Sequence, residues 1–586
     1  MRAATVPPAL DRFTEVWCVD FEFIALPGRL PDPVCCIARE LRSGRESRLW
    51  LGGSPLASPP PIGPEAVLVA YYASAELGCY LALGWPLPAQ VIDLFAEFRV
   101  WANGRDDALG IRGSSLLSAL AHFRLTHLDP EVKTGWRDRI IAGPPYSDED
   151  REGILDYCRS DVVALGALLD PLVGRLQSRP NWLDHALLRG RSMAAVAHME
   201  HTGTPVDTPT LALLSEHWAE IKLALVADIG QDYPFFEGAT LKLDPFGKWL
   251  AEREIGWPRT ETGRLSVSED TFKTMSKAHP EIAPVHELRE GLAKLRITEM
   301  AVGDDGRNRC LLSPFRARTG RNQPSTSKFI FAPSVWLRSL IQPKPGRALA
   351  YIDYSSQEIG IAAALSGDVA MQVAYDSGDP YIAFAIEAGL APSTATKVSH
   401  KPLREQCKAI VLGTLYGMQE KTLAGNLNIA TAEARLLLKA HRRTYATFWA
   451  WSQRATDAAM LTGYIDTCFG WRLHITADTR PTALLNHPMQ SHGAEMLRLA
   501  SIFMTEGGIH VCAPIHDALL IEAPEDQIEA AVSQAQAFMG RASRLVLSGY
   551  EIRTEAEIIR YPDRYRDPRG KDMWARIMEI LARRSG

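Results

Sequence analysis

Apolar and polar positions recur with two different periods along the chain, and the change of period divides it. Residues 15–175 hold two short apolar runs, "VWCVDFEFI" and "AVLVAYYA", and then a long helical pattern, "ILDYCRSDVVALGALLDPLVGRL". Short strands that alternate with helices indicate an α/β domain. Residues 177–184, "QSRPNWLD", have the composition of a linker. We therefore place a first domain at 1–178.

Helical periodicity dominates the rest of the chain, with strands at two places. It runs from the linker to about residue 300 and again over 368–460, and the chain ends in the amphipathic pattern "MWARIMEILARR". "RALAYIDYS" (347–355) predicts a strand, and 509–524 predicts two strands around a tight turn. Strands and helices in separate blocks favour an α+β domain, which we place at 179–586.

Composition narrows the class of protein without naming it. A chain of 586 residues is too long for one hydrophobic core. The net charge of −5 means that any contact with nucleic acid must come from local basic patches. Nine scattered cysteines without a CxxC pair favour reduced thiols, and no run has the length of a membrane span or the pattern of a signal peptide. We expect a cytoplasmic location and no membrane partner.

The predicted helix at 402–418 has an unusual polar face. Its apolar stripe faces a core, but a second row at spacing four consists of Arg404, Lys408, Leu412 and Tyr416. Two cations at i and i+4 repel each other. An anionic partner that lies against this row would explain them.

Two aspartates lie at the ends of predicted strands, where they could hold metal ions. Asp353 ends the strand "LAYIDYS", and Asp517 lies at the tip of the predicted hairpin. Either one alone would be an ordinary solvated turn residue. Together they could share the pair of metal ions, about 4 Å apart, that phosphoryl transfer uses. The Arg/Lys row would then contact a triphosphate.

These residues and their order resemble the family A DNA polymerases. The segment "DYSSQE" is similar to motif A, Arg404-x3-Lys408-x7-Tyr416-Gly417 to motif B, and His516-Asp517 to motif C. "ARTGRNQP" resembles the family's primer-template segment, and "LLNHPMQSHGAEM" resembles its minor-groove segment. Five motifs in the family's order make a specific match.

The resemblance implies a role for each residue. Asp353 and Asp517 would bind two Mg²⁺ ions, with Mn²⁺ as a substitute, and Lys408 would contact the triphosphate and donate a proton to the leaving pyrophosphate. Glu358 would exclude a ribose 2′-hydroxyl. The other nucleotide-binding residues implied are Tyr354, Arg404, Leu412, Tyr416 and His516. The DNA-binding residues implied are Arg321, Asn486 and Gln490, although the last two could also form an ordinary surface pair.

Three positions depart from the family's pattern. Leu412 stands where an aromatic residue is usual, Ala518 stands where motif C usually has a second acid, and Thr482 stands where a basic residue is usual. Two carboxylates remain for metal binding despite Ala518.

The first domain resembles the DEDD-type 3′–5′ exonucleases of the tyrosine subclass. Asp20 and Glu22 project from one face of a strand, and Tyr157 and Asp161 lie at i, i+4 on a helix. In that family four acids hold two metal ions and the tyrosine orients the attacking water. The fourth acid here would be Glu76, with Asp93 as the competing candidate.

The resemblance therefore implies an RNase H-like α/β exonuclease domain ahead of a right-hand polymerase. Its thumb would lie at about 209–300, its fingers at about 370–465 and its palm in the remainder. We expect a compact, phage- or plasmid-type DNA-directed DNA polymerase without a 5′ nuclease domain, monomeric, acting on primer-template DNA and dNTPs, with replication accessory proteins as possible partners. The alternatives are a single-subunit RNA polymerase and an inactive DNA-binding accessory protein.

Overall fold

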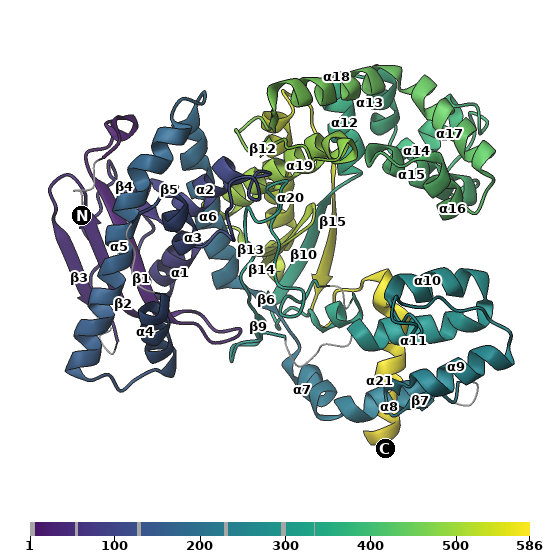
Figure 1. Ribbon diagram of the computed structural model, residues 1–586, viewed down its shortest axis with the longest axis horizontal. Coiled ribbons are helices and arrows are strands. Elements are labelled where there is room, and N and C mark those ends of the chain that lie inside the picture. The colour runs from purple at the N-terminus through teal and green to yellow at the C-terminus, as the bar shows by residue number, and fades with distance from the viewer. Residues whose placement is uncertain are drawn as a thin grey trace.

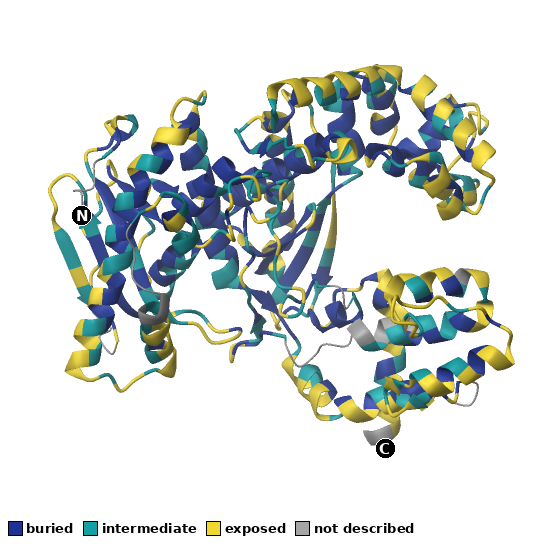
Figure 2. Cartoon of the chain, in the orientation of Figure 1, coloured by how far each residue is buried: buried dark blue, intermediate teal, exposed yellow. Residues whose placement is uncertain are grey.

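The computed structural model describes residues 6–52, 57–125, 130–227, 233–294, 300–332 and 335–585. It contains an N-terminal α/β domain, a central antiparallel sheet, and two helical lobes that project from the same side of that sheet (Figure 1). Buried residues concentrate in the two sheets and the helices against them, while the outer helices of the lobes alternate buried and exposed positions (Figure 2). Within the described part of the chain, no helix combines the length and the apolar character needed to cross a bilayer.

The N-terminal sheet has five strands in the order β3-β2-β1-β4-β5. Strands β1, β2 and β3 are antiparallel, whereas β1, β4 and β5 are parallel. The strands are β1 (Val16–Ile24), β2 (Asp32–Glu40), β3 (Glu46–Trp50), β4 (Val67–Ala70) and β5 (Val91–Asp93). The sequence analysis predicts β1 and β4 and does not identify β2 or β3, so the α/β prediction is right but the antiparallel edge is an addition.

Five helices complete this domain: α1 (Ser74–Ala82), α2 (Leu94–Ala102), α3 (Leu116–His122), α4 (Pro130–Ala142) and α5 (Asp148–Leu176). Helix α5 packs along β1 and β2. It begins at a capping box, in which Ser147 and Asp150 each accept a hydrogen bond from the other's backbone N–H. This cap and the packing fix the position of α5 relative to β1, the two elements that carry most of the predicted exonuclease residues.

The predicted linker is shorter than expected. Helix α5 continues to Leu176 and α6 (Trp182–Thr202) begins after five intervening residues, so the last three residues of 177–184 are helical. Trp182 is buried, and its indole N–H donates a 2.7 Å hydrogen bond to Glu97 of α2. The same carboxylate receives two bonds from Arg189, whose guanidinium also donates to the carbonyl of Phe469.

A buried side-chain amide also joins the two domains near this point. The Asn103 side chain, with none of its surface exposed, donates 2.8 Å bonds to the carbonyls of Arg318 and Arg472. Residues from the first domain thus bond directly to segments more than 200 positions away in the chain. The linker prediction missed this because Trp182 and Glu97 pair only in three dimensions.

The buried Arg189–Glu97 pair allows a stability prediction. Glu97→Gln removes the negative charge and leaves the guanidinium buried, which costs about 3–5 kcal/mol for a desolvated pair. The matched control is Glu506→Gln, which breaks a bidentate pair with Arg191, two residues along the same helix but about half exposed. There the expected loss is below about 1 kcal/mol. Urea denaturation of both variants measures the difference, and equal losses would contradict it.

The central sheet has four antiparallel strands in the order β13-β14-β10-β15. They are β10 (Arg347–Tyr354), β13 (His510–Ile515), β14 (Ala518–Pro524) and β15 (Thr554–Arg560). The strand at 347–355 and the hairpin at 509–524 are confirmed. Helices α19 (Pro481–Glu506) and α20 (Ile528–Val546) pack on this sheet and on each other. Ala348, Ala350 and Ile352 of β10 point into their core, so Leu349, Tyr351 and Asp353 lie on the other face.

Two groups of helices flank the sheet. The first comprises α7 (Thr208–Glu216), α8 (Trp218–Ala227), α9 (Leu243–Glu252), α10 (Glu269–Ala278) and α11 (Ala283–Lys294), with the short hairpin β7 (Phe236–Glu237) and β8 (Thr240–Leu241). The C-terminal helix α21 (Lys571–Ser585) packs against α8. The expected division leaves α21 with the palm, and α21 contacts two segments of that palm, 335–340 and 568–570, as well as α8 of the first helical group, beside which it lies in Figure 1.

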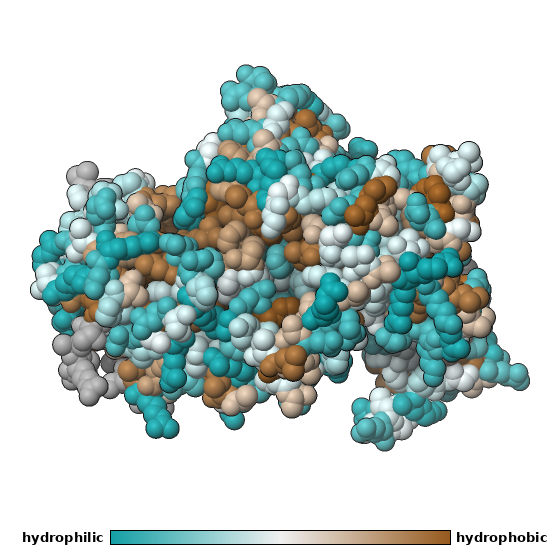
Figure 3. All heavy atoms as spheres, turned by 90° about the horizontal axis from the view of Figure 1, so that it is seen from above, coloured by the Kyte–Doolittle hydropathy of each residue, from teal (hydrophilic) through white to brown (hydrophobic). Residues whose placement is uncertain are grey.

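The second group follows β10 in sequence. It comprises α12 (Gln357–Ser366), α13 (Val369–Asp376), α14 (Pro380–Glu387), α15 (Lys401–Leu415), α16 (Glu420–Leu427), α17 (Thr431–Thr444) and α18 (Ala446–Thr462). Two small two-stranded sheets remain, β6 (Thr204–Pro205) with β9 (Arg307–Asn308) and β11 (Tyr464–Asp466) with β12 (Arg472–His474). Seen from above, hydrophilic residues cover much of the molecule, with apolar residues gathered in patches between them (Figure 3).

Candidate active sites

The central sheet brings the two predicted aspartates together. Asp353 at the end of β10 pairs with Ala518 of β14, the residue directly after Asp517. The backbone N–H of Tyr354 donates to the carbonyl of Asp517 at 3.3 Å. His516 precedes Asp517 in the turn with φ +54°, a left-handed conformation that costs about 1–3 kcal/mol in a non-glycine residue. Such a turn lets the hairpin present its carboxylate beside β10.

The two carboxylates influence each other's charge. Burial raises the pKa of Asp353 to about 6, and the negative charges of Asp517 and then Glu555 add to that rise. Burial also raises the pKa of Asp517, against the lowering effects of its own backbone N–H and of Arg321. Carboxylates that repel one another in a partly buried site are suited to a shared divalent cation, whose preferred ligands are oxygens.

Helix α15 carries the predicted cation row beside the start of α14. Arg404 donates a 2.6 Å bond to Asp379, the N-cap of α14, and lies over the ring of Tyr381. The exposed Lys408 lies 5.9 Å from the centre of the same ring, and no ion pair of its ammonium occurs within the described residues. Leu412 is partly buried against the helical core. The row therefore keeps Lys408 available while Arg404 is held in place.

Three predicted residues from three different elements meet at one oxygen. The Tyr416 hydroxyl donates to Glu358 Oε1 at 2.7 Å, and Gln490 Nε2 donates to both Glu358 Oε1 and the Tyr416 oxygen. Burial and the neighbouring Glu358 carboxylate raise the pKa of Tyr416 to about 12, and the nearby Asn486 side chain opposes that rise. Gln490 is 7% exposed and bonds within this cluster, and no hydrogen bond between Asn486 and Gln490 occurs among the described residues, which argues against the alternative of a plain surface pair.

The prediction that Tyr354 binds nucleotide is wrong. Its side chain is 1% exposed, it lies in the core under α19 and α20, and its hydroxyl donates to the carbonyl of Met539 at 2.9 Å. Neighbouring residues on a strand point to opposite faces, so a residue next to Asp353 must face away from the carboxylates. The motif identifies the type of residue at this position, but it does not record that strand residues alternate between the two faces of the sheet.

Arg321 and His516 line a cavity of about 540 Å³ next to the carboxylates. Its wall also contains segment 320–326, part of α19, and the guanidinium-bearing Arg338, Arg498 and Arg569. Burial lowers the pKa of His516, and the positive charges of Arg321 and Arg338 lower it further. Arg338 and Arg569 pair with Asp567, and Arg498 pairs with Glu495. No ion pair of Arg321 occurs among the described residues, so its charge is the one that this wall offers to an anionic ligand. Sequence analysis found only Arg321 of these arginines.

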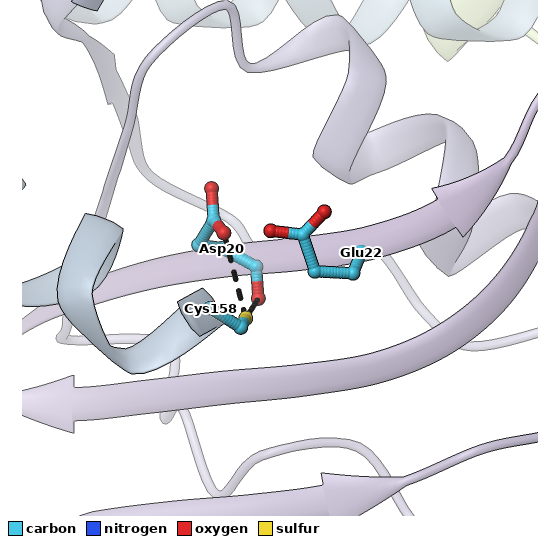
Figure 4. Close-up of side chains that lie close together, drawn as sticks. All are labelled: Asp20, Glu22 and Cys158. Carbon is cyan, nitrogen blue, oxygen red and sulfur yellow. Dashed lines mark hydrogen bonds between the residues drawn. The ribbon is translucent and has the colours of Figure 1, made fainter. Parts of the chain in front are cut away.

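A second group of acids lies in the N-terminal domain. Asp20 and Glu22 extend from β1 toward Cys158 of α5 (Figure 4), and one potential ligand atom from each lies within 4.8 Å of the others. The Cys158 thiol donates to the Asp20 carbonyl at 3.3 Å and to its carboxylate at 3.4 Å. Burial raises the pKa of Asp20 well above its usual value, and the charge of Asp161 adds to this. Tyr157 lies close enough that the charges of Glu22 and Asp161 raise its pKa as well.

The two candidates for the fourth acid differ in their surroundings. Glu76 on α1 is 5% exposed, and its Oε2, like the buried Oδ2 of Asp93, has no hydrogen-bond partner among the described residues. Burial raises the pKa of Glu76 well above the usual range, and the charge of Asp20 adds to that rise. Asp93 instead caps α2, accepting 2.9 Å bonds from the backbone N–H groups of Tyr72 and Phe95. A buried carboxylate oxygen without a donor, turned toward other acids, fits a divalent cation. The charge contact of Glu76 with Asp20 favours Glu76 as the fourth acid over Asp93, which is engaged as a helix cap.

Sequence reasoning missed two members of this cluster. Lys133 of α4 forms a 2.7 Å ion pair with Asp161, with both side chains about 15% exposed. It also lies over the ring of Tyr157, 5.7 Å from its centre. Cys158 directly follows Tyr157, so a motif search that stops at the tyrosine and the aspartate passes over it. No pattern along the chain marks Lys133.

The antiparallel sheet with its paired aspartates, between two helical lobes, defines the palm of a right-hand nucleic-acid polymerase fold. The chain is similar to a solved structure described as "POL domain of Pol1 from M. smegmatis complex with DNA primer-template and dNTP". The TM-score is 0.72 at 19% identity, and the match covers 95% of this chain and 98% of that one.

The chain belongs to DNA polymerase family A, because the model of that family matches residues 246–558, more than half of its length. It is 27% identical over 402 residues to the thermostable DNA polymerase I of Thermus aquaticus, covering 63% of this chain and 47% of that protein. It is also 27% identical over 300 residues to a DNA polymerase of Mycobacterium phage L5, covering 50% and 48%. The chain spans about half the length of the relatives it matches. The predicted family is confirmed.

Proposed function

We propose that this protein is a DNA-directed DNA polymerase that adds deoxynucleotides to a primer 3′ end. The observation that carries the proposal is the strand register that brings Asp353 beside Asp517, with the Lys408 helix in the lobe that follows. Family A membership and the relatives' names support the same activity. The bound primer-template and dNTP named for the similar structure support the choice of ligands.

The carboxylates fit Mg²⁺, with Mn²⁺ as a substitute. Asp353 and Asp517 would hold two ions, which lower the pKa of the primer 3′-hydroxyl and neutralise charge on the transferring phosphoryl group. A site of repelling, partly buried carboxylates with a neighbouring backbone turn meets the requirement for hard oxygen ligands.

The chain's own residues account for the remaining steps. Lys408 contacts the triphosphate and donates a proton to the pyrophosphate oxygen as it leaves. Arg404 adds positive charge from the preceding turn, oriented by Asp379. Leu412, Tyr416 and His516 border the nucleotide, and Arg321 with the arginine-lined cavity holds the primer-template backbone.

The domains then take the expected roles. Helices α7–α11 form the thumb, α13–α18 the fingers, and the central sheet the palm, with α21 joined to the thumb. We expect a cytoplasmic monomer, with replication accessory proteins as further partners.

Primer extension tests this function directly. A labelled primer annealed to a template is incubated with Mg²⁺ and either dNTPs or NTPs. Extension with dNTPs alone supports the proposal. Extension with NTPs would favour the RNA polymerase alternative, and binding of DNA without extension would favour the inactive accessory protein.

The Glu358 cluster predicts how sugars are distinguished. With Tyr416 and Gln490 bonded to its carboxylate, Glu358 cannot turn aside to admit a 2′-hydroxyl. Glu358→Ala should therefore raise the kcat/KM ratio of rCTP to dCTP by roughly 100-fold. Glu433→Ala, an exposed acid on α17, serves as the control. Unchanged selectivity in Glu358→Ala would show that another group excludes the hydroxyl.

For the N-terminal domain we propose 3′–5′ exonuclease activity. Asp20, Glu22, Glu76 and Asp161 would hold two Mg²⁺ ions and Tyr157 would orient the attacking water. The proposal is supported by the convergence of these side chains from three elements and by the partnerless oxygen of Glu76. Because Lys133 pairs with Asp161, its ammonium would have to move away from that carboxylate when two ions bind.

A further inference from the structure

The row of residues across the central sheet contains a carboxylate that no motif identified. In the register of β10 with β14, Asp353 lies opposite Ala518, and in the register of β10 with β15 it lies opposite Glu555. Ala518, Asp353 and Glu555 therefore occupy one row over three adjacent strands. Side chains directly opposite each other on antiparallel strands point to the same face, with Cβ atoms about 5 Å apart.

This face of the sheet is the one on which Asp353 lies. Ala518, Leu349 and Leu520 belong to the core on the side of the sheet away from α19 and α20, as the alternation along β10 requires for Asp353. Glu555 shares the parity of this row. Its charge also acts on Asp353, as described above.

The residues on the two sides of Asp353 in this row, Ala518 and Glu555, differ in their exposure. Ala518 is fully buried, with none of its surface accessible, so apolar packing closes that side of the row. Glu555 is exposed on the edge strand β15. Within the described residues its carboxylate has no ion pair, whereas nearby Glu551 is paired with Arg544. An unpaired carboxylate across from Asp353 is free to turn toward a cation held there.

We propose that Glu555 is a third carboxylate ligand, direct or through a bound water, of the metal ions held by Asp353 and Asp517. It supplies from β15 the accessory negative charge that Ala518 cannot supply from β14. The inference rests on the proposed polymerase function for its meaning, but the metal binding itself is separately measurable.

A matched pair of variants tests it: Glu555→Gln and Glu557→Gln. Glu557 lies two residues along the same strand on the same face, also exposed, but opposite Tyr351 instead of Asp353. Both are made in the Asp20→Asn background, which weakens the other carboxylate centre. Mn²⁺ binding is measured by electron paramagnetic resonance on the complex with a dideoxy-terminated primer-template and the next dNTP. Single-nucleotide incorporation is then measured as a function of Mg²⁺.

Glu555→Gln should weaken Mn²⁺ binding and raise the half-saturating Mg²⁺ concentration, each about tenfold. The dNTP KM at saturating Mg²⁺ should stay unchanged, and Glu557→Gln should match the parent in every measurement. Identical Mn²⁺ binding by the two variants would overturn the inference. If the parent binds Mn²⁺ but does not extend primers, the polymerase proposal fails, while weaker Mn²⁺ binding by Glu555→Gln alone still supports the ligand assignment.

Discussion

Asp353→Asn is expected to reduce single-nucleotide incorporation by at least about 10³-fold while leaving primer-template affinity close to that of the parent. Coordination of the reacting oxygens by metal ions supplies several kcal/mol of transition-state stabilisation, and each 1.4 kcal/mol is a factor of ten in rate. The amide keeps the size of the carboxylate but not its charge, so β10 and its register with β14 should remain intact. Rapid-quench incorporation and fluorescence anisotropy with labelled DNA measure the two quantities.

A surface aspartate gives the control for this variant. Asp526 is exposed just beyond β14, so Asp526→Asn should incorporate nucleotides at the parent rate. Unfolding curves for both variants exclude a loss of structure. If Asp353→Asn kept even a tenth of the parent rate with DNA binding intact, the central sheet would not be the polymerisation site.

The second large effect concerns trimming of DNA 3′ ends. Asp20→Asn should lower Mg²⁺-dependent trimming of single-stranded DNA by about 10³-fold, and Glu76→Gln by at least about 100-fold, because each removes a charge from the proposed metal ligands. Polymerisation should be unchanged in both, since neither residue contacts the central sheet. Gel analysis of labelled oligonucleotides, with and without a chelator, measures trimming.

Asp93→Asn separates the two candidates for the fourth acid. Asp93 accepts its capping bonds through one oxygen, and asparagine caps helices as well as aspartate does, so folding should persist. Burial raises the pKa of Asp93 to about 7, which already makes its charge easy to lose. Trimming should therefore survive Asp93→Asn and fail in Glu76→Gln. The opposite result would return the role to Asp93.

Local sequence patterns predicted the elements that carry the chemistry because those elements are strongly periodic. The apolar run before Asp353, the turn at Asp517 and the four-residue spacing of Arg404 and Lys408 are short-range features. The edge strands β3 and β15 were not identified, since their polar and apolar residues depend on which neighbours cover them. Because β15 was not identified, the sequence could not show that Glu555 lies opposite Asp353, a position that the pairing of the strands creates.

Partners that are distant in sequence explain the other differences. Lys133 meets Asp161, and Glu358 meets Gln490, only after helices from separate segments pack together. Tyr354 was misassigned because a motif does not record which way a strand residue points. The segment at 177–184 was assigned to a linker because its composition is polar, although Trp182 is buried against Glu97.

The buried bonds of Glu97 and Asn103 have a consequence for how a growing strand could be corrected. They join the N-terminal domain to the rest of the chain, with α6 packed against elements of both. If the N-terminal domain trims 3′ ends as proposed, a mispaired end would have to separate from its template and travel to that domain, because breaking these buried bonds to bring the domain closer is costly. Editing would be governed by how easily the last base pairs melt.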